Sequence, residues 1–483
     1  MNTVIIGAGI NGEVCANYLA RGGHSVTVLE RADRVGGACV RHVTDIDGQT
    51  FSFPGGASVF GFMQDFVWRE TGLADRLQFE PADNVYYYPA GSRGSSGPWR
   101  HMEEEDSPQF HADGEKVAAF LQKGFRDAEV PTLESANRQI GPELTKLWIT
   151  GSARDLVDHY FTSPEQKIAI VLSVNESGPV GIDEAFSAFT ISLMHTGSVD
   201  SEGRWGYVKG GIWRVTEELE RLNGRLDVTT VTSARVLSAD PDSGRVVYEK
   251  DGVTTALHAD QVVFATEPLT AARLIKDRSL EEQISGMRLM GTSGKVVMFF
   301  RDHPRFKDGL GDTLRFLICN TELDVFNEAA LSVKQSATAD FVPGYLELYP
   351  ESRSDDLGYG LLSVFFKHVT LGKIGEELSH VRQFVVDQVL ALLDNPEDFI
   401  GSILRTPQDL CTVFGFAGGN IDHVEIANPH TYVGRTFSTH PSESFFQFGS
   451  HRRVYYCGAG TYPCGSVAGT GGYMCATQIL RGQ

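Results

Sequence analysis

Residues 4–37 constrain the fold more strongly than any other part of the sequence. An apolar run over residues 4–6 is followed by Gly7, Gly9 and Gly12, which have the spacing GxGxxG. The apolar run predicts a buried parallel strand, and the residues after Gly9 have the periodicity of a helix. This order of strand, glycine turn and helix predicts the first half of a β-α-β nucleotide-binding unit.

Each glycine of the motif has a separate physical role. Gly7 permits a tight turn after the strand, and Gly9 lacks a Cβ, so a pyrophosphate can approach the main chain. Gly12 allows the helix to pack closely on the strand. The start of the helix then offers unpaired N–H groups and the positive end of its dipole to the phosphates. We therefore expect Gly7, Gly9 and Gly12 to hold a dinucleotide.

A second β-branched run over residues 26–29 ends at Glu30, 18 residues after Gly12. An acid at this place can accept hydrogen bonds from the 2′-hydroxyl of a ribose, and it would repel a 2′-phosphate. The strand, helix, second strand and acid are in register, so a dinucleotide site is favoured over an ordinary glycine-rich turn. NADP is not expected there.

The residues after Glu30 indicate which dinucleotide is bound. The text V-L-E-R-A-D-R-V-G-G-A, which contains Arg31, Gly37 and Ala38, resembles the extended signature of the FAD proteins related to amine oxidases and phytoene desaturases. Within that superfamily the chain looks most like the carotenoid isomerase-like and pyridine nucleotide-disulphide oxidoreductase domain-containing branch. The resemblance implies FAD as the cofactor, with Glu30, Arg31, Gly37 and Ala38 among its contacts.

Further segments carry the same resemblance. The turn after the short strand at 51–53 corresponds to residues that line the flavin ring in the family. The strand near residue 231 corresponds to a strand that contacts the adenine through its main chain in the family. The C-terminal text C-G-A-G-T-Y-P-C-G-S-V-A-G resembles the family's last flavin-binding segment. The resemblance implies further cofactor contacts at Gly56, Ala57, Val231, Gly460, Gly465, Ser466 and Val467.

These features predict an α/β protein with a discontinuous Rossmann-like FAD-binding domain and an α+β substrate domain. We assign residues 1–75, 200–290 and 440–483 to the FAD-binding domain. The substrate domain takes residues 76–199 and 291–439. Strand-like runs between residues 295 and 366 predict a mixed or antiparallel sheet that floors a substrate cavity.

The bulk composition excludes several classes of partner. The 483 residues carry a net charge of −20, which argues against nucleic acid. No apolar stretch is long enough to cross a membrane, and no secretory signal is evident, although peripheral membrane contact is compatible with the sequence. Seven cysteines without a CxxC motif indicate free thiols and a cytoplasmic protein. The sequence leaves the oligomeric state open and shows no metal-binding pattern.

The resemblance implies an FAD-dependent oxidoreductase that removes hydride from a C–H bond of a small-molecule substrate. Desaturation or isomerisation of an unsaturated, apolar substrate is the leading interpretation, and an amine or amino-acid oxidase is the alternative. A non-catalytic binding protein on the same fold is disfavoured by the intact glycine motifs. Since no second dinucleotide motif is present, O₂ or a quinone is expected to reoxidise the flavin.

The sequence does not assign a catalytic residue. His423, in the segment G-G-N-I-D-H, and His440 are candidate positioning groups or bases, although each also suits a structural role. Cys464 stands where glycine is common in the family. It is interpreted as a small core residue, with a covalent flavin link as the minority alternative.

Overall fold

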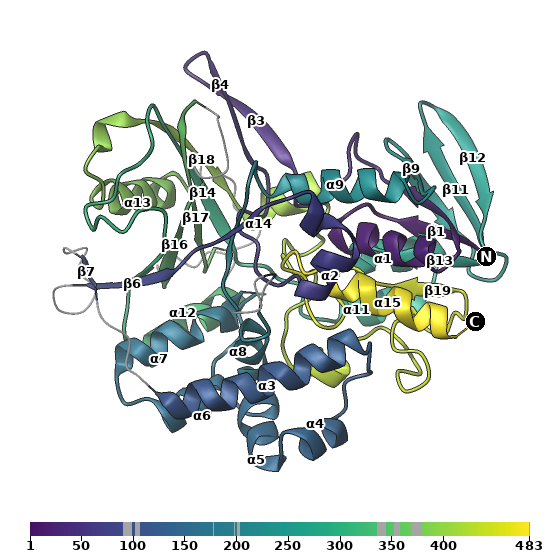
Figure 1. Ribbon diagram of the computed structural model, residues 1–483, viewed down its shortest axis with the longest axis horizontal. Coiled ribbons are helices and arrows are strands. Elements are labelled where there is room, and N and C mark those ends of the chain that lie inside the picture. The colour runs from purple at the N-terminus through teal and green to yellow at the C-terminus, as the bar shows by residue number, and fades with distance from the viewer. Residues whose placement is uncertain are drawn as a thin grey trace.

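The computed structural model describes residues 1–89, 99–101, 107–176, 178–197, 199, 203–335, 344–351, 358–369 and 378–482 (Figure 1). Both chain ends lie at the same end of the molecule, beside a parallel sheet (Figure 1). A larger mixed sheet lies at the opposite end, and a layer of helices runs along one side of the molecule.

The parallel sheet has five strands in the order β19-β13-β1-β2-β9. Its strands are β1 (Asn2–Ile6), β2 (Ser25–Leu29), β9 (Thr229–Val231), β13 (Gln261–Phe264) and β19 (Val454–Tyr456). They come from all three ranges predicted for the FAD-binding domain, so distant parts of the chain form one nucleotide-binding sheet. This confirms the predicted fold class, whereas the domain boundaries stay a prediction.

Helices α1 (Ile10–Arg21), α9 (Trp213–Gly224) and α15 (Thr470–Arg481) pack side by side against this sheet. The contact between the two chain ends is close, because a Cβ on Gly472 of α15 would lie 2.1 Å from the carbonyl oxygen of Asn11 in α1. The other face is covered by α10 (Pro268–Ile275), by α11 (Arg278–Ser285) and by the antiparallel sheet β10 (Arg235–Ala239), β11 (Arg245–Lys250) and β12 (Val253–His258).

The mixed sheet has seven strands in the order β18-β14-β17-β16-β15-β6-β7. All of its neighbours are antiparallel except β6 and β15, which are parallel. The strands are β6 (Asn84–Pro89), β7 (Trp99–His101), β14 (Gly294–Phe300), β15 (Leu314–Ile318), β16 (Tyr345–Pro350), β17 (Gly360–Phe366) and β18 (Phe399–Arg405). The sheet predicted from the runs between 295 and 366 is therefore present.

The two faces of this sheet differ in chemistry, because side chains alternate along a strand. One face is covered by α13 (Ser379–Leu390) and carries apolar residues such as Val296, Leu348 and Val364. On the opposite face, residues in register across five strands are Lys295, Phe365, Glu347, Phe316 and Tyr86. Charged groups therefore occur on the face that points away from α13.

A helical layer joins the two sheets. It comprises α3 (Pro108–Arg126), α4 (Leu133–Gln139), α5 (Pro142–Leu144), α6 (Ala153–Tyr160), α7 (Pro164–Val171), α8 (Ala188–Met194) and α12 (Leu323–Gln335). Ser163 caps α7 by accepting a hydrogen bond from the Gln166 N–H, and Pro164 occupies the first turn, where a proline is well tolerated.

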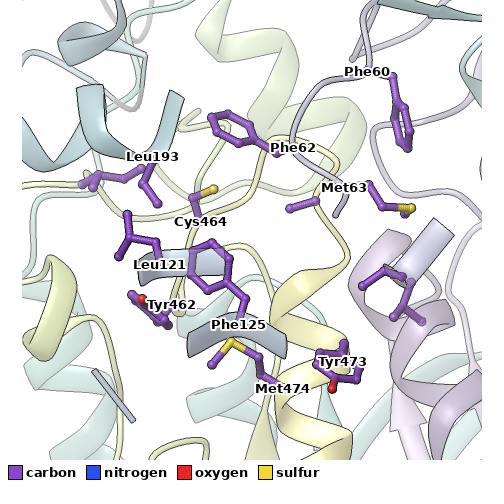
Figure 2. Close-up of a cluster of buried hydrophobic side chains, with 14 of the residues drawn as sticks. Phe60, Phe62, Met63, Leu121, Phe125, Leu193, Tyr462, Cys464, Tyr473 and Met474 are labelled. Carbon is purple, nitrogen blue, oxygen red and sulfur yellow. The ribbon is translucent and has the colours of Figure 1, made fainter. Parts of the chain in front are cut away.

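The largest apolar cluster connects this layer to the cofactor sheet (Figure 2). Leu121 and Phe125 of α3 and Leu193 of α8 lie around Cys464, and Met474 of α15 completes this part of the cluster. The helical layer is thus fixed to the C-terminal segment by a continuous core.

Shorter elements include the hairpin β3 (Arg41–Ile46) and β4 (Gln49–Pro54), helix α2 (Asp65–Glu70), the pair β5 (Phe79–Pro81) and β8 (Gly206–Val208), and the helical turn α14 (Pro407–Asp409). Among the described helices, we find none with the length and apolar character needed to cross a membrane.

Candidate functional site

A cavity of about 340 Å³ lies at the carboxyl ends of β1 and β2, where open parallel sheets bind their ligands. Both chain ends contribute to its wall. The predicted cofactor residues that line it are Gly7, Gly9, Glu30, Arg31, Gly37, Ala38, Gly465, Ser466 and Val467. The structure therefore brings together the two glycine-rich segments that the sequence identified.

The middle of this cavity has the features of a pyrophosphate cradle. Gly9 precedes α1 without a side-chain cap, so the first N–H groups of the helix are not bonded by a capping side chain. Gly37 lies across from it, since a Cβ on Gly37 would be 3.2 Å from the Cα of Gly9. Gly7 has a φ of 106°, which disfavours other residues. These residues fit the diphosphate of FAD.

Glu30 lies at the end of the cavity that suits an adenosine. Its two carboxylate oxygens accept hydrogen bonds from the N–H groups of Ala8 and Ala32, each at 2.8 Å. These bonds fix the carboxylate beside the cavity, where its remaining lone pairs can accept from ribose hydroxyls. Next to it the wall is formed by Ala234, Arg235 and Val236, which the sequence did not single out.

Five predicted cofactor residues do not line this cavity. Gly12 packs below the cradle, where a Cβ would lie 2.2 Å from the Gly7 carbonyl oxygen. The Val231 carbonyl accepts the Glu30 N–H at 2.9 Å, and the Gly460 carbonyl contacts the His430 ring nitrogen at 3.0 Å. Their predicted roles stay predictions.

Gly56 and Ala57 are the other two, and they lie directly behind the cavity wall. The N–H of Ala57 donates to the Ala38 carbonyl at 3.1 Å, and a Cβ on Gly56 would meet the same oxygen at 2.6 Å. The turn after β4 therefore supports Ala38, which does line the cavity.

The C-terminal turn is held in an unusual conformation. Ser466 and Val467 have φ values of 49° and 60°, and a β-branched residue rarely adopts a positive φ. The Gly465 N–H donates to the buried carboxylate of Asp422 at 2.7 Å. Asp422 thus helps to hold strained residues at the cavity wall, as is common where a ligand is bound.

Cys464 lies on the other side of this turn. It is 2% exposed, it belongs to the apolar cluster in Figure 2, and burial raises the pKa of its thiol. A thiol in such surroundings is poorly reactive. These features favour its interpretation as a core residue.

The two candidate histidines lie in different places. His423 lines the cofactor cavity, with Nδ1 at 3.3 Å from the Tyr456 hydroxyl. Burial, aided by the Arg435 charge, lowers the pKa of His423 to about 3, so its imidazole is neutral at pH 7 and is a weak base. His440 is exposed and lines none of the described cavities.

Lys295 was missed as a functional residue and was predicted only as the start of a strand. It is 6% exposed, and its Nζ donates to the carbonyl oxygens of Pro54 and Gly56, at 2.8 and 2.6 Å, and to Ser58 Oγ at 3.2 Å. Burial lowers the pKa of Lys295 to about 8, although the Glu351 carboxylate opposes this effect. The sequence did contain a signal for a buried lysine, because Lys295 begins the otherwise apolar run K-V-V-M-F-F.

A larger cavity of about 760 Å³ lies between the polar face of the mixed sheet and helices α3, α7 and α8. Its wall includes Tyr86 and Phe316, whose rings stack with centroids 5.0 Å apart, together with Trp205. Glu347 also lines it, two strands from Lys295 in the same register. Adjacent strands are about 4.8 Å apart, so roughly 10 Å separates these two positions.

The chain combines a cavity suited to a dinucleotide with a second cavity of about 760 Å³ on the mixed sheet. The chain belongs to the flavin containing amine oxidoreductase family, because the model of that family matches residues 12–356. The protein is therefore an FAD-dependent oxidoreductase, as the sequence motifs predicted.

Similarities to individual proteins are consistent with membership of this family. The chain is 23% identical to pyridine nucleotide-disulfide oxidoreductase domain-containing protein 2 of Rattus norvegicus, over 99% of this chain and 93% of that protein. It is 26% identical to a phytoene desaturase of Fusarium fujikuroi, over 54% of this chain and 48% of that protein. Its fold is similar to that of cyclohexylamine oxidase from Brevibacterium oxydans, with a TM-score of 0.59 at 15% identity, covering 100% and 98% of the two chains. The predicted resemblance is confirmed.

Proposed function

We propose that the protein removes a hydride from a C–H bond of a small molecule held in the larger cavity. FAD would accept the hydride, while the protein binds and orients the substrate. This proposal rests on the position of Lys295. Its Nζ donates a hydrogen bond to the Gly56 carbonyl oxygen, in the turn behind the cofactor cavity. Its place on the sheet is in register with Glu347, which lines the larger cavity.

The segment after this turn also connects the two cavities. Phe60 exchanges main-chain hydrogen bonds of 3.0 Å with Gly206, which follows Trp205 in the wall of the larger cavity. Val59 packs with Tyr207 and Tyr349, and Tyr349 also lines that cavity. A substrate bound there would lie beside the residues that support Ala38 and the cofactor.

Two substrate classes fit such a reaction. The similarity to a phytoene desaturase supports a C–H bond next to an unsaturated carbon, oxidised by desaturation or isomerised. The lining of the larger cavity favours a C–H bond next to a basic nitrogen, because it contains Glu115, Glu176 and Glu347 and, among its described residues, neither lysine nor arginine. Amine oxidation is therefore the second candidate function.

Reduction of the bound flavin by candidate substrates tests the proposal. The purified protein should be yellow, and anaerobic addition of a substrate should bleach the flavin band at about 450 nm. Primary amines and conjugated polyenes would be compared at equal concentration. Bleaching by one class identifies the reaction, whereas a colourless protein that takes up no FAD would contradict the proposed function.

We also propose a cellular compartment and an electron acceptor for the reaction. The seven cysteines are free thiols, which suits a reducing compartment such as the cytoplasm. O₂ or a quinone would reoxidise the flavin, since the sequence carries a single dinucleotide motif. Mixing reduced protein anaerobically with a quinone, and separately with O₂, would distinguish the two acceptors by the rate at which the flavin colour returns.

A further inference from the structure

His195 lies at the C-terminal end of α8, in the wall of the larger cavity. Its Nδ1 is 2.9 Å from the main-chain carbonyl oxygen of Ile191, one turn earlier in the helix. A carbonyl oxygen can only accept a hydrogen bond, so Nδ1 carries the proton of the neutral ring. The other ring nitrogen, Nε2, is therefore left with a lone pair and no proton.

This Nε2 atom is open to the cavity. Within the described part of the chain it makes no hydrogen bond, and it is not among the fully buried polar atoms that lack a partner. Because His195 lines the larger cavity, the accessible side of Nε2 faces the cavity interior. Burial lowers the pKa of His195 below its usual range, so the ring is neutral at pH 7. The cavity wall thus carries an unoccupied hydrogen-bond acceptor.

The imidazole ring is held in place by its neighbours. Phe110 and Trp148 pack edge-to-face with it, each with ring centroids 5.2 Å away. Gly114 of α3 lies against the edge that contains Nε2, since a Cβ there would be 3.2 Å from Nε2 and 2.9 Å from Cδ2. Glycine inside a helix lowers the stability of the helix. At position 114 it leaves the Nε2 edge uncrowded, which any larger residue would not.

The surrounding walls suit an apolar molecule that carries a hydrogen-bond donor. Gln122 of α3 lines the same cavity, and its Nε2 donates to the Thr196 carbonyl oxygen at 2.6 Å, which leaves its Oε1 as a second acceptor. On the sheet side, the stacked rings of Tyr86 and Phe316 offer apolar surfaces. A few placed polar groups in such a cavity fix the orientation of the ligand.

We propose that His195 determines substrate specificity, with its Nε2 accepting a hydrogen bond from a hydroxyl group on an apolar substrate. This inference rests on the proposed function, because it takes the larger cavity as the substrate site. A hydroxyl group suits a neutral imidazole since neither partner is charged, so binding leaves no unbalanced charge in the cavity. The hydroxyl group orients the substrate, while the C–H bond that loses hydride lies elsewhere on the molecule.

Binding to the chemically reduced holoenzyme, kept anaerobic, tests this without turnover. Benzyl alcohol would be compared with benzyl methyl ether, which has a similar apolar body but no donor. A net hydrogen bond between neutral groups is worth about fivefold in affinity, and the ether also leaves Nε2 unpaired. The alcohol should therefore bind at least about fivefold more tightly by calorimetry. Equal affinities would overturn the proposal.

Variants of His195 separate the acceptor from the ring. His195→Phe keeps an aromatic ring between Phe110 and Trp148 but has no acceptor, so the preference for the alcohol should disappear. His195→Gln places an amide oxygen near the position of Nε2 and should keep most of the preference. His258→Phe, at an exposed position on β12 outside the cavity lining, is the control and should bind as the unaltered protein does. A preference that survives in His195→Phe would contradict the proposal.

Nitrogen NMR on the unaltered protein decides the question even if His195→Phe does not fold. With isotope-labelled histidine, the resonance of one unprotonated ring nitrogen should shift when benzyl alcohol binds and stay in place with the ether. His111 and His195 are the histidines among the described lining residues. A shift that persists in His111→Gln therefore belongs to His195, and the absence of any such shift would overturn the proposal.

The results also separate this inference from the proposed reaction. A preference for the alcohol that depends on His195, but no flavin reduction by any amine or polyene, would support the hydroxyl site and contradict the reaction. Flavin reduction by an amine or a polyene, with equal binding of the alcohol and the ether, would support the reaction and contradict the hydroxyl site.

Discussion

The side-chain nitrogen of Lys295 lies 2.6 Å from the main-chain carbonyl oxygen of Gly56, although 239 residues separate them in the sequence. The bond joins the mixed sheet to the turn that supports Ala38 in the cofactor cavity. Three acceptors from residues 54–58 surround this nitrogen, so the lysine sets the distance between the substrate sheet and the cofactor wall.

Replacing Lys295 should therefore misalign the two cavities. Lys295→Met retains the length of the side chain but leaves buried carbonyl groups unpaired, and we expect a stability loss of about 1–3 kcal/mol. A displacement of about 1 Å between substrate and cofactor should slow flavin reduction by roughly 100-fold. Stopped-flow reduction and thermal unfolding measure the two effects. Lys276→Met, at an exposed position directly after α10, should change neither.

The charge of Lys295 should appear in the pH profile of flavin reduction. The pKa of this lysine is lowered to about 8 by burial, and burial raises the pKa of nearby Glu351 to about 7. Glu351→Gln removes a negative charge that favours the ammonium form, so the alkaline inflection should move to lower pH by roughly one unit. Reduction rates measured from pH 6 to 10 test this, and an inflection that stays in place would show that another group titrates.

Glu13 should make stability depend on pH. This carboxyl is fully buried between α1 and α9, it accepts from Asn223 at 2.7 Å, and burial raises its pKa to about 8 from 4.5. Because the folded-state pKa is the higher one, its stabilising effect is complete below pH 4.5 and is lost as the pH rises to 8. Glu13→Gln should remove this loss, making the variant more stable than the unaltered protein at pH 9 by about 2 kcal/mol or more. Urea unfolding at pH 5 and 9 measures the difference, and exposed Glu134→Gln should show none.

Glu30 should contribute directly to FAD retention. Glu30→Arg removes the predicted ribose acceptor, and we expect FAD binding to weaken by about 1–3 kcal/mol. Asp33→Arg makes the same change of charge at an exposed position outside the cofactor cavity, so it serves as the control. Fluorescence titration of the apoprotein with FAD gives both constants. Equal losses in the two variants would mean that charge, and not the ribose contact, is responsible.

Asp422 should act through the turn that it holds. Asp422→Ala leaves the Gly465 N–H without its acceptor, so Ser466 and Val467 should relax and FAD should bind about tenfold more weakly. Asp422→Asn keeps an oxygen at this place and should restore most of the affinity. The visible spectrum of the bound flavin is a second readout, because a turn that contacts the ring affects its absorption and a remote structural change does not.

The sequence by itself determined the cofactor half of this protein. The glycine spacing, Glu30 and the C-terminal glycine segment lie in short stretches whose chemistry depends on near neighbours, so the residues at the cavity wall were predictable there. Beside Glu30, the wall is formed by Ala234, Arg235 and Val236, which the sequence did not single out, and the role of Val231 stays a prediction. The few residues between β9 and β10 turn the chain, and their path depends on the strands on either side.

Only the tertiary structure decided the substrate half. Lys295, Glu347 and Glu176 occur in separate segments that have no motif of their own, and the last two line the same cavity because strand pairing and helix packing bring them together. In sequence, Glu347 is an acid within an apolar strand, which does not reveal whether it faces solvent or a cavity. The register of the mixed sheet settles that question, since a shift of one residue would turn Glu347 into the apolar core beneath α13.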